Sequence, residues 1–114
     1  MGDRPCIEVW SRDAREDWVR EILAGAEEEG VWLCVTPCDS GDADSLAQSA
    51  SSASALGIGV GLHRQQAVVW IEALHRFNPL MRTEIKTTER ARELGANAAR
   101  YIKGTPLKAG GWIG

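Results

Sequence analysis

The fold of this chain is decided by the segment Gly57-Ile58-Gly59-Val60-Gly61-Leu62-His63-Arg64-Gln65-Gln66-Ala67-Val68-Val69-Trp70-Ile71. Two strand-like runs, 57–62 and 67–71, flank four polar residues that make a tight turn, which is the pattern of a β-hairpin. This hairpin, in the middle of the chain, adds one antiparallel strand to the predicted sheet.

The first half of the chain alternates between strand and helix patterns. Strands are predicted at 6–10 and 31–35, and helices at 13–29 and 44–55, where apolar residues recur at helical spacing. The segment 44–55 is rich in Ala and Ser, so a flexible linker is its alternative interpretation. Asp13 is the predicted N-cap of the first helix. The run 31–35 is continuously apolar, which favours a strand covered on both faces.

The second half supplies one more strand and a long helix. Asn78-Pro79 breaks the chain before an edge strand at 80–83, and Thr87 caps a last helix that ends at Lys103. The resulting order is β-α-β-α-β-β-β-α, and alternating strands and helices imply parallel pairing. We therefore predict an α/β fold, a three-layer α/β/α sandwich. Its mixed, mostly parallel sheet has about five strands, one of them antiparallel.

Length and composition indicate one small globular domain at 1–108, followed by a glycine-rich flexible tail at 109–114. The chain has 114 residues, of which 25% are charged and 44% hydrophobic, as in ordinary globular proteins. The formal net charge of −3 argues against a nucleic-acid partner. No apolar run approaches the roughly 20 residues of a membrane span.

The three cysteines, Cys6, Cys34 and Cys38, are predicted to be reduced thiols. Their number is odd, and the N-terminus has no apolar core of a secretory signal, which together indicate a cytosolic chain. Cys34 and Cys38 could be half of a zinc site, but His63 and His75 lack the paired spacing that would complete it. Cys6 and Cys34 fall within apolar runs and are expected to be buried.

Three glycines, Gly57, Gly59 and Gly61, alternate within a predicted strand and should share one face. They do not form the dinucleotide motif, which opens a helix. A bare sheet surface where a helix or a partner packs closely is the favoured interpretation, so Gly59 and Gly61 are candidate interface residues. A small enzyme or a metabolite- or nucleotide-binding domain using this strand and His63 is the competing class. No nucleophile–base pair supports it, and no catalytic residue is assigned.

Three consecutive glutamates, Glu27-Glu28-Glu29, stand where the first helix should end at Gly30. Carboxylates are unfavourable at a helix C-terminus, and no Lys or Arg stands three or four residues upstream. A solvated helix end tolerates this at about 1 kcal/mol. The functional alternative is an acidic surface that meets a cation or a basic protein surface. Helix physics alone does not choose between the two.

Three segments resemble a known family, the small subunit of the reactivating factors for diol and glycerol dehydratases. The first is Gly25-Ala26-Glu27-Glu28-Glu29-Gly30-Val31, and the second runs from Gly59-Val60-Gly61-Leu62 through Val68-Val69 to Asn78-Pro79-Leu80. The third and most specific is Leu94-Gly95-Ala96-Asn97-Ala98-Ala99-Arg100-Tyr101-Ile102-Lys103-Gly104-Thr105-Pro106-Leu107. The resemblance covers nearly the whole chain, although residues 85–93 match poorly and the tail from Ala109 has no counterpart.

The resemblance implies a fold, a partner and a role. Members of this family have the dehydratase medium-subunit fold and bind a large ATPase subunit that is actin- and Hsp70-like. The small subunit is not itself an enzyme and binds no cobalamin directly. It can change places with the medium subunit of the coenzyme B12-dependent dehydratase, so that damaged cobalamin leaves. A noncatalytic piece of the dehydratase itself is a further alternative.

The resemblance also assigns one residue a metal. The middle glutamate of the acidic run helps to hold Mg²⁺ at the interface with the large subunit, and that position is Glu28. Glu27 and Glu29 are then its acidic flanks at the interface. The implied location is cytoplasmic. The choice between glycerol and propanediol systems, and any association with a bacterial microcompartment, stay open.

Overall fold

The computed structural model describes residues 5–108, so the predicted tail at 109–114 lies outside the described residues. The elements follow the predicted order, with one added 3₁₀ helix, η1. They are β1 (Ile7–Arg12), α1 (Glu16–Glu28), β2 (Leu33–Pro37), α2 (Ala43–Ala53), β3 (Ile58–His63), β4 (Gln66–Ile71), η1 (Glu72–Phe77), β5 (Met81–Glu84) and α3 (Thr88–Lys103).

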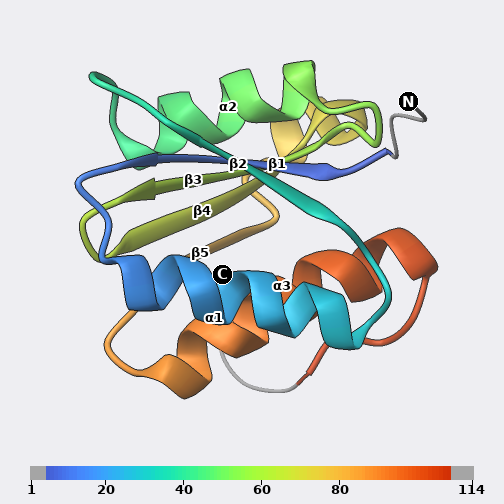
Figure 1. Cartoon of the computed structure of the whole chain (residues 1–114). Helices are drawn as coiled ribbons and strands as arrows, with labels where there is room; N and C mark the ends of the chain where they lie inside the picture. The colour runs from blue at the N-terminus through green and yellow to red at the C-terminus, as the bar shows by residue number, and fades with distance from the viewer. Residues whose placement is uncertain (1–4, 109–114) are drawn as a thin grey trace.

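The five strands form one mixed sheet in the order β2-β1-β3-β4-β5. β1 is parallel to β2 and β3, whereas β4 is antiparallel to both β3 and β5. β4 is therefore the only reversed strand of this sheet. Helix α2 covers one face, and α1 and α3 cover the other (Figure 1). The prediction of an α/β/α sandwich with a mostly parallel sheet is confirmed.

The main hydrophobic core lies between the sheet and the helix pair α1 and α3. Its largest fully buried side chains include Ile7, Val9, Ile22, Ile58 and Leu94. Burying one such side chain stabilises the fold by about 1.5–3 kcal/mol. The cluster on the other face is small, with Ala43, Ala47 and Val68 buried and Trp70 packed against them. Most of the hydrophobic stabilisation therefore comes from the α1–α3 side.

Helix α2 packs directly on the glycines of β3. A Cβ on Gly59 would lie 2.2 Å from the amide nitrogen of Ser51, and a Cβ on Gly61 would lie 2.0 Å from the carbonyl oxygen of Ala43. The helix interpretation of this bare surface is therefore correct, and the assignment of Gly59 and Gly61 to a partner interface is corrected. Gly57 does not share their face, because it precedes β3 with a positive φ of 71°.

The start of α1 differs from its prediction. The helix begins at Glu16, and its N-cap is Arg15, which makes no side-chain capping hydrogen bond. β1 continues to Arg12 because it pairs with β3 as far as His63. Asp13 then occupies the turn with a φ of 53° and cannot cap the helix. The predicted cap of the last helix is confirmed, because the Thr87 hydroxyl accepts a hydrogen bond from the amide of Arg90. Gly104 follows the end of this helix with a φ of 72°.

β2 is an edge strand, and the prediction that it is covered on both faces is wrong. It pairs only with β1, while α2 lies over β3 and β4, and four of its five residues are exposed. Val35 keeps 38% of its surface exposed, and Trp32, just before the strand, keeps 53%. An apolar run reveals a strand but not its position in the sheet. Within residues 5–108, no helix combines the length and the apolar character that a bilayer span requires.

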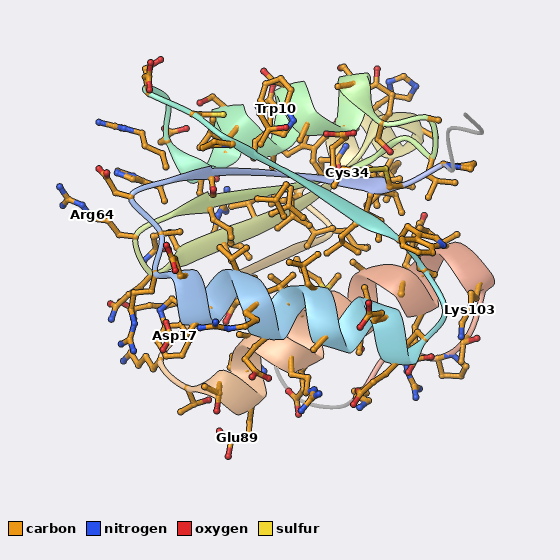
Figure 2. The ribbon with its side chains drawn as sticks, in the orientation of Figure 1. Trp10, Asp17, Cys34, Arg64, Glu89 and Lys103 are labelled. Carbon is orange, nitrogen blue, oxygen red and sulfur yellow. A yellow bond between two sulfur atoms is a disulfide. The ribbon has the colours of Figure 1, made fainter. Side chains whose placement is uncertain are left out.

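Cys6 and Cys34 are joined by a disulfide, with Cys6 half-buried and Cys34 exposed, so the prediction that these two cysteines are reduced and buried is corrected in this structure. Their Cα atoms are 6.1 Å apart, and Cys38 is the free cysteine. The parallel pairing of β1 with β2 places Glu8 opposite Cys34, which brings Cys6 diagonally beside it. Figure 2 shows Cys34 on β2, with Trp10 on the side of the sheet that faces α2.

Candidate functional site at the acidic end of helix α1

The acidic run occupies the C-terminal turn of α1, as predicted. Glu28 is the last helical residue, Glu29 is the C-cap, and Gly30 follows with a φ of 79°. The amide of Val31 donates to the carbonyl of Ala26 at 3.1 Å and closes the turn. This ending is the glycine-dependent type in which a left-handed residue satisfies the last carbonyls.

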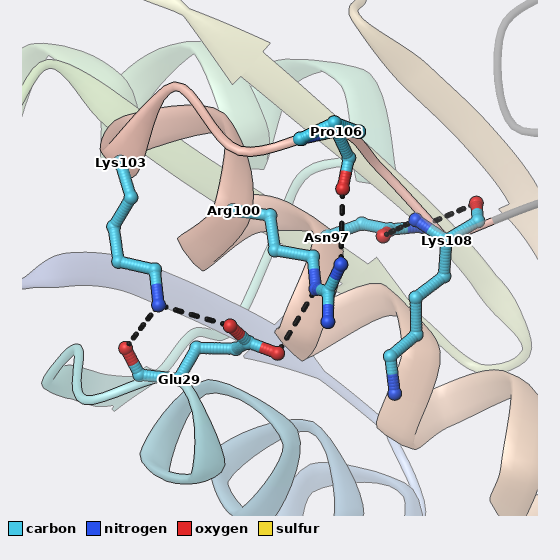
Figure 3. Close-up of polar contacts among 6 residues, drawn as sticks. All are labelled: Glu29, Asn97, Arg100, Lys103, Pro106 and Lys108. Atoms are coloured by element: carbon cyan, nitrogen blue, oxygen red, sulfur yellow. Dashed lines mark hydrogen bonds and ion pairs between the residues drawn. The ribbon is translucent and has the colours of Figure 1, made fainter.

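Glu29 is the most strongly held of the three glutamates. Its carboxylate accepts hydrogen bonds from Arg100 Nε and Lys103 Nζ, both at 2.9 Å, and only 14% of its side chain is exposed. Lys103 also donates to the Glu29 main-chain carbonyl at 2.9 Å (Figure 3). The absence of a cation in the last turn of α1 is therefore compensated from α3. The acidic helix end is therefore partly neutralised without a partner, because Glu29 is bound by Arg100 and Lys103 of its own chain.

The same contacts lower the pKa of Glu29 below its ordinary value, first through the hydrogen bond from Lys103 and then through that from Arg100. A carboxyl whose pKa is lower in the folded chain contributes stability above its unfolded pKa. That contribution is lost as the pH falls through the lowered value. The Glu29 contacts should therefore stabilise the fold at neutral pH and fade below about pH 4.

Glu29→Gln is expected to lower the melting temperature at pH 7 and to approach the wild-type value as the pH falls below about 4. Thermal unfolding followed by circular dichroism from pH 3 to pH 7 measures this. Glu27→Gln is the matched control, since Glu27 is exposed and makes no ion pair within residues 5–108. A Glu29→Gln deficit of equal size at every pH would contradict a charge-based role.

Glu28 has a different environment. Half of its side chain is exposed, and its Oε2 lies 3.3 Å from Arg92 Nη2 on α3. Arg92 also lies 3.7 Å from Glu21 Oε1, so one guanidinium is shared between two carboxylates of α1. An exposed pair of this kind is worth at most about 1 kcal/mol. Of the three glutamates, Glu28 therefore combines an exposed carboxylate with a cation that can be displaced.

The oxygen ligands at this helix end could supply part of a Mg²⁺ site, but not all the ligands that Mg²⁺ needs. Mg²⁺ takes oxygen ligands, keeps several waters and commonly binds only one or two carboxylates from one source. Glu27 and Glu28 each offer an exposed carboxylate, whereas Glu29 is occupied by Arg100 and Lys103. Further ligands would have to come from water and from a second protein.

The third sequence segment fastens the end of α3. Asn97 is fully buried, and its Oδ1 accepts a hydrogen bond from the amide of Lys108 at 2.7 Å. Arg100 bonds Glu29 and also donates from Nη1 to the carbonyl of Pro106 at 3.1 Å (Figure 3). The motif therefore links α1, α3 and the segment after α3.

Sequence reasoning found the acidic residues but missed their basic partners. Arg92, Arg100 and Lys103 are separated by eight and three residues, so they follow one side of α3. That basic stripe was the available signal. Its pairing with α1 depends on how the two helices pack, which local spacing does not reveal.

The structure does not bring together the residues on which the competing small-molecule interpretation depends. His63 ends β3 beside the hairpin turn, whereas His75 lies in η1, beyond the opposite end of the hairpin. A cavity of about 650 Å³ opens near η1, lined in part by Trp70, Glu72 and His75. Glu72 already accepts the hydroxyls of Ser51 and Ser52. Of the residues in that interpretation, Gly57 lines this cavity, whereas Gly59 and Gly61 lie under α2 and His63 is not among the lining residues.

The chain belongs to the dehydratase medium subunit family, whose model matches residues 4–108. The family resemblance of the three sequence segments is thereby confirmed.

Within that family the chain is similar to reactivating-factor subunits. It is 32% identical over 104 residues to the propanediol dehydratase-reactivating factor small subunit of Citrobacter freundii, covering 90% of this chain and 82% of the relative. A solved glycerol dehydratase reactivase superposes with a TM-score of 0.85 at 27% identity, covering 93% of this chain and 98% of that one. A diol dehydratase-reactivating factor complexed with ADP and Mg²⁺ gives a TM-score of 0.84 at 30% identity, with coverages of 94% and 100%.

Proposed function

We propose that this chain is the noncatalytic small subunit of a chaperone-like reactivase for a coenzyme B12-dependent diol or glycerol dehydratase. In this role it binds a large, actin- and Hsp70-like ATPase subunit, which carries any ATPase activity. It also changes places with the medium subunit of the dehydratase, so that damaged cobalamin is released. The chain itself binds no cobalamin.

One observation carries the proposal: the chain joins two resemblances in one fold. It belongs to the dehydratase medium subunit family, while the relatives to which it is similar are small subunits of reactivating factors. A protein that shares the fold of a dehydratase subunit is suited to occupy that subunit's position. The name "small subunit" supports a larger partner within the factor.

Mg²⁺ enters the proposal at Glu28. The related factor binds Mg²⁺ together with ADP, which supports a metal in the assembly. We assign Glu28 as the ligand donated by this subunit, because it stands at the position that the family resemblance indicates, and its carboxylate is half exposed and held by the shared Arg92. When bound, Mg²⁺ would neutralise negative charge at the acidic helix end where it meets the partner. Glu27 would lie beside the metal ligand Glu28, and Glu29 would hold the helix end in place through its ion pairs with α3.

Coexpression with the candidate partners tests the proposal. A tagged copy of this chain should copurify with the large ATPase subunit in buffer containing Mg²⁺. Elution of the two as separate species would count against the role. Copurification with the dehydratase large subunit, and not with the ATPase, would instead identify the chain as a piece of the dehydratase.

The proposed location is the cytoplasm. In a reducing cytosol disulfides are rare, so Cys6 and Cys34 would be present there mainly as thiols. Association with a microcompartment is a separate question, which fractionation of the native host would answer.

A further inference from the structure

We propose that Cys6, Cys34 and Glu8 form a binding site for Zn²⁺ when the two cysteines are reduced. The site lies on β1 and β2, across the sheet from the helix pair that carries the acidic run. It does not depend on the proposed function.

The strand register brings the three side chains together. Glu8 and Cys34 are direct partners in the parallel pairing of β1 with β2, and Cys6 lies two residues before Glu8 on the same face. One ligand atom from each lies within 4.8 Å of the other two. Two sulfurs on a tetrahedral zinc stand about 3.8 Å apart, given Zn–S bonds of about 2.3 Å. Small side-chain rotations therefore suffice once the sulfur–sulfur bond is absent.

The donor set suits zinc chemically. Thiolate and carboxylate are both zinc ligands, and three protein ligands leave a fourth position for water or an added molecule. Cys34 is exposed and the other two ligands are half-buried, so an ion can enter from solvent. Trp10 Nε1 donates a hydrogen bond to Glu8 Oε1 at 3.3 Å. Such a contact orients a ligating carboxylate and leaves its other oxygen available.

The disulfide and the metal exclude each other. A phosphine reductant with one water supplies two electrons and two protons, which convert the disulfide to two thiols and the phosphine to its oxide. Zn²⁺ then replaces the two thiol protons and releases them to solvent. Oxidation of the thiols would remove two of the three ligands. Zinc binding should therefore occur only in the reduced chain.

The experiment titrates the full chain with Zn²⁺ alone. The chain is reduced with a phosphine, freed of reductant without oxygen, and titrated against a chromophoric chelator, with calorimetry in two buffers to count protons. We expect one Zn²⁺ per reduced chain, about two protons released, and no binding by the disulfide form. Co²⁺ in place of Zn²⁺ should give a thiolate charge-transfer band.

Variants assign the ligands. Cys34→Ser should weaken Zn²⁺ binding by at least about 100-fold and Glu8→Gln by about tenfold, while Cys38→Ser, a cysteine farther along the chain, should leave it unchanged. Circular dichroism checks that each variant is folded; Cys6→Ser replaces Cys34→Ser if the latter is not. Absence of binding by the reduced chain, equal binding by the disulfide form, or an equal loss in Cys38→Ser would overturn the proposal.

Discussion

Replacing Gly95 with alanine is expected to destabilise the chain by roughly 3 kcal/mol or more. A Cβ at Gly95 would lie 1.9 Å from the carbonyl oxygen of Ile22, and one at Gly25 would lie 2.0 Å from that of Arg92. The two helices therefore cross with backbone against backbone. Helix propensity alone favours alanine over glycine by about 0.5–1 kcal/mol. The steric clash must therefore cost more free energy than the higher helix propensity of alanine provides. Urea denaturation monitored by circular dichroism measures the difference.

Gly104→Ala is the matched control for Gly95→Ala. It lies at the end of the same helix, and an added Cβ there meets nothing within 4 Å in the described part of the chain. Its cost should come only from the positive φ of 72°, at about 1–2 kcal/mol. If the two variants were destabilised equally, close packing of α1 on α3 would not be what Gly95 provides.

Glu28→Ala is expected to remove the Mg²⁺ dependence of pairing with the large subunit and to weaken pairing by at least about tenfold at saturating Mg²⁺. Glu27 and Glu28 are both exposed, and Glu28 is the one proposed as the metal ligand. Its ion pair with Arg92 is worth at most about 1 kcal/mol, which a divalent cation can overcome. Titration of complex formation against Mg²⁺ measures the effect.

Glu27→Ala serves as the control for Glu28→Ala, because it removes an equal charge one residue away. It should leave the Mg²⁺ midpoint nearly unchanged. Equal losses in both variants would indicate general attraction between charged surfaces and not a metal ligand. A loss in Glu28→Ala that is the same with and without Mg²⁺ would also exclude the metal role.

The spacing of apolar residues was sufficient to predict the three layers of this fold. The hairpin at 57–71 fixed the reversed strand, and the alternation before it fixed the parallel ones. Strand order was not available from local pattern, so β2 was expected in the interior although it lies at the edge. Register was not available either. The Cys6–Cys34 pair depends on Glu8 lying opposite Cys34, and neither cysteine signals this by its sequence position.

The candidate site was found in sequence for a reason that proved incomplete. Spacings of three or four residues identify ion pairs only within one helix, and by that criterion the acidic run is unpaired. The cations that hold Glu29 are 71 and 74 residues away, at Arg100 and Lys103. Only the packing of α1 on α3 brings them together, and that packing depends on Gly25 and Gly95, which carry no charge.

The glycine crossing of α1 and α3 also bears on how fast a partner can associate. With the helices in backbone contact and Glu29 bound to α3, the acidic end is held in one arrangement before any encounter. Little conformational entropy remains to be lost on docking. Association at this end should then be limited by diffusion and orientation, and its rate should vary with ionic strength more than its dissociation rate does.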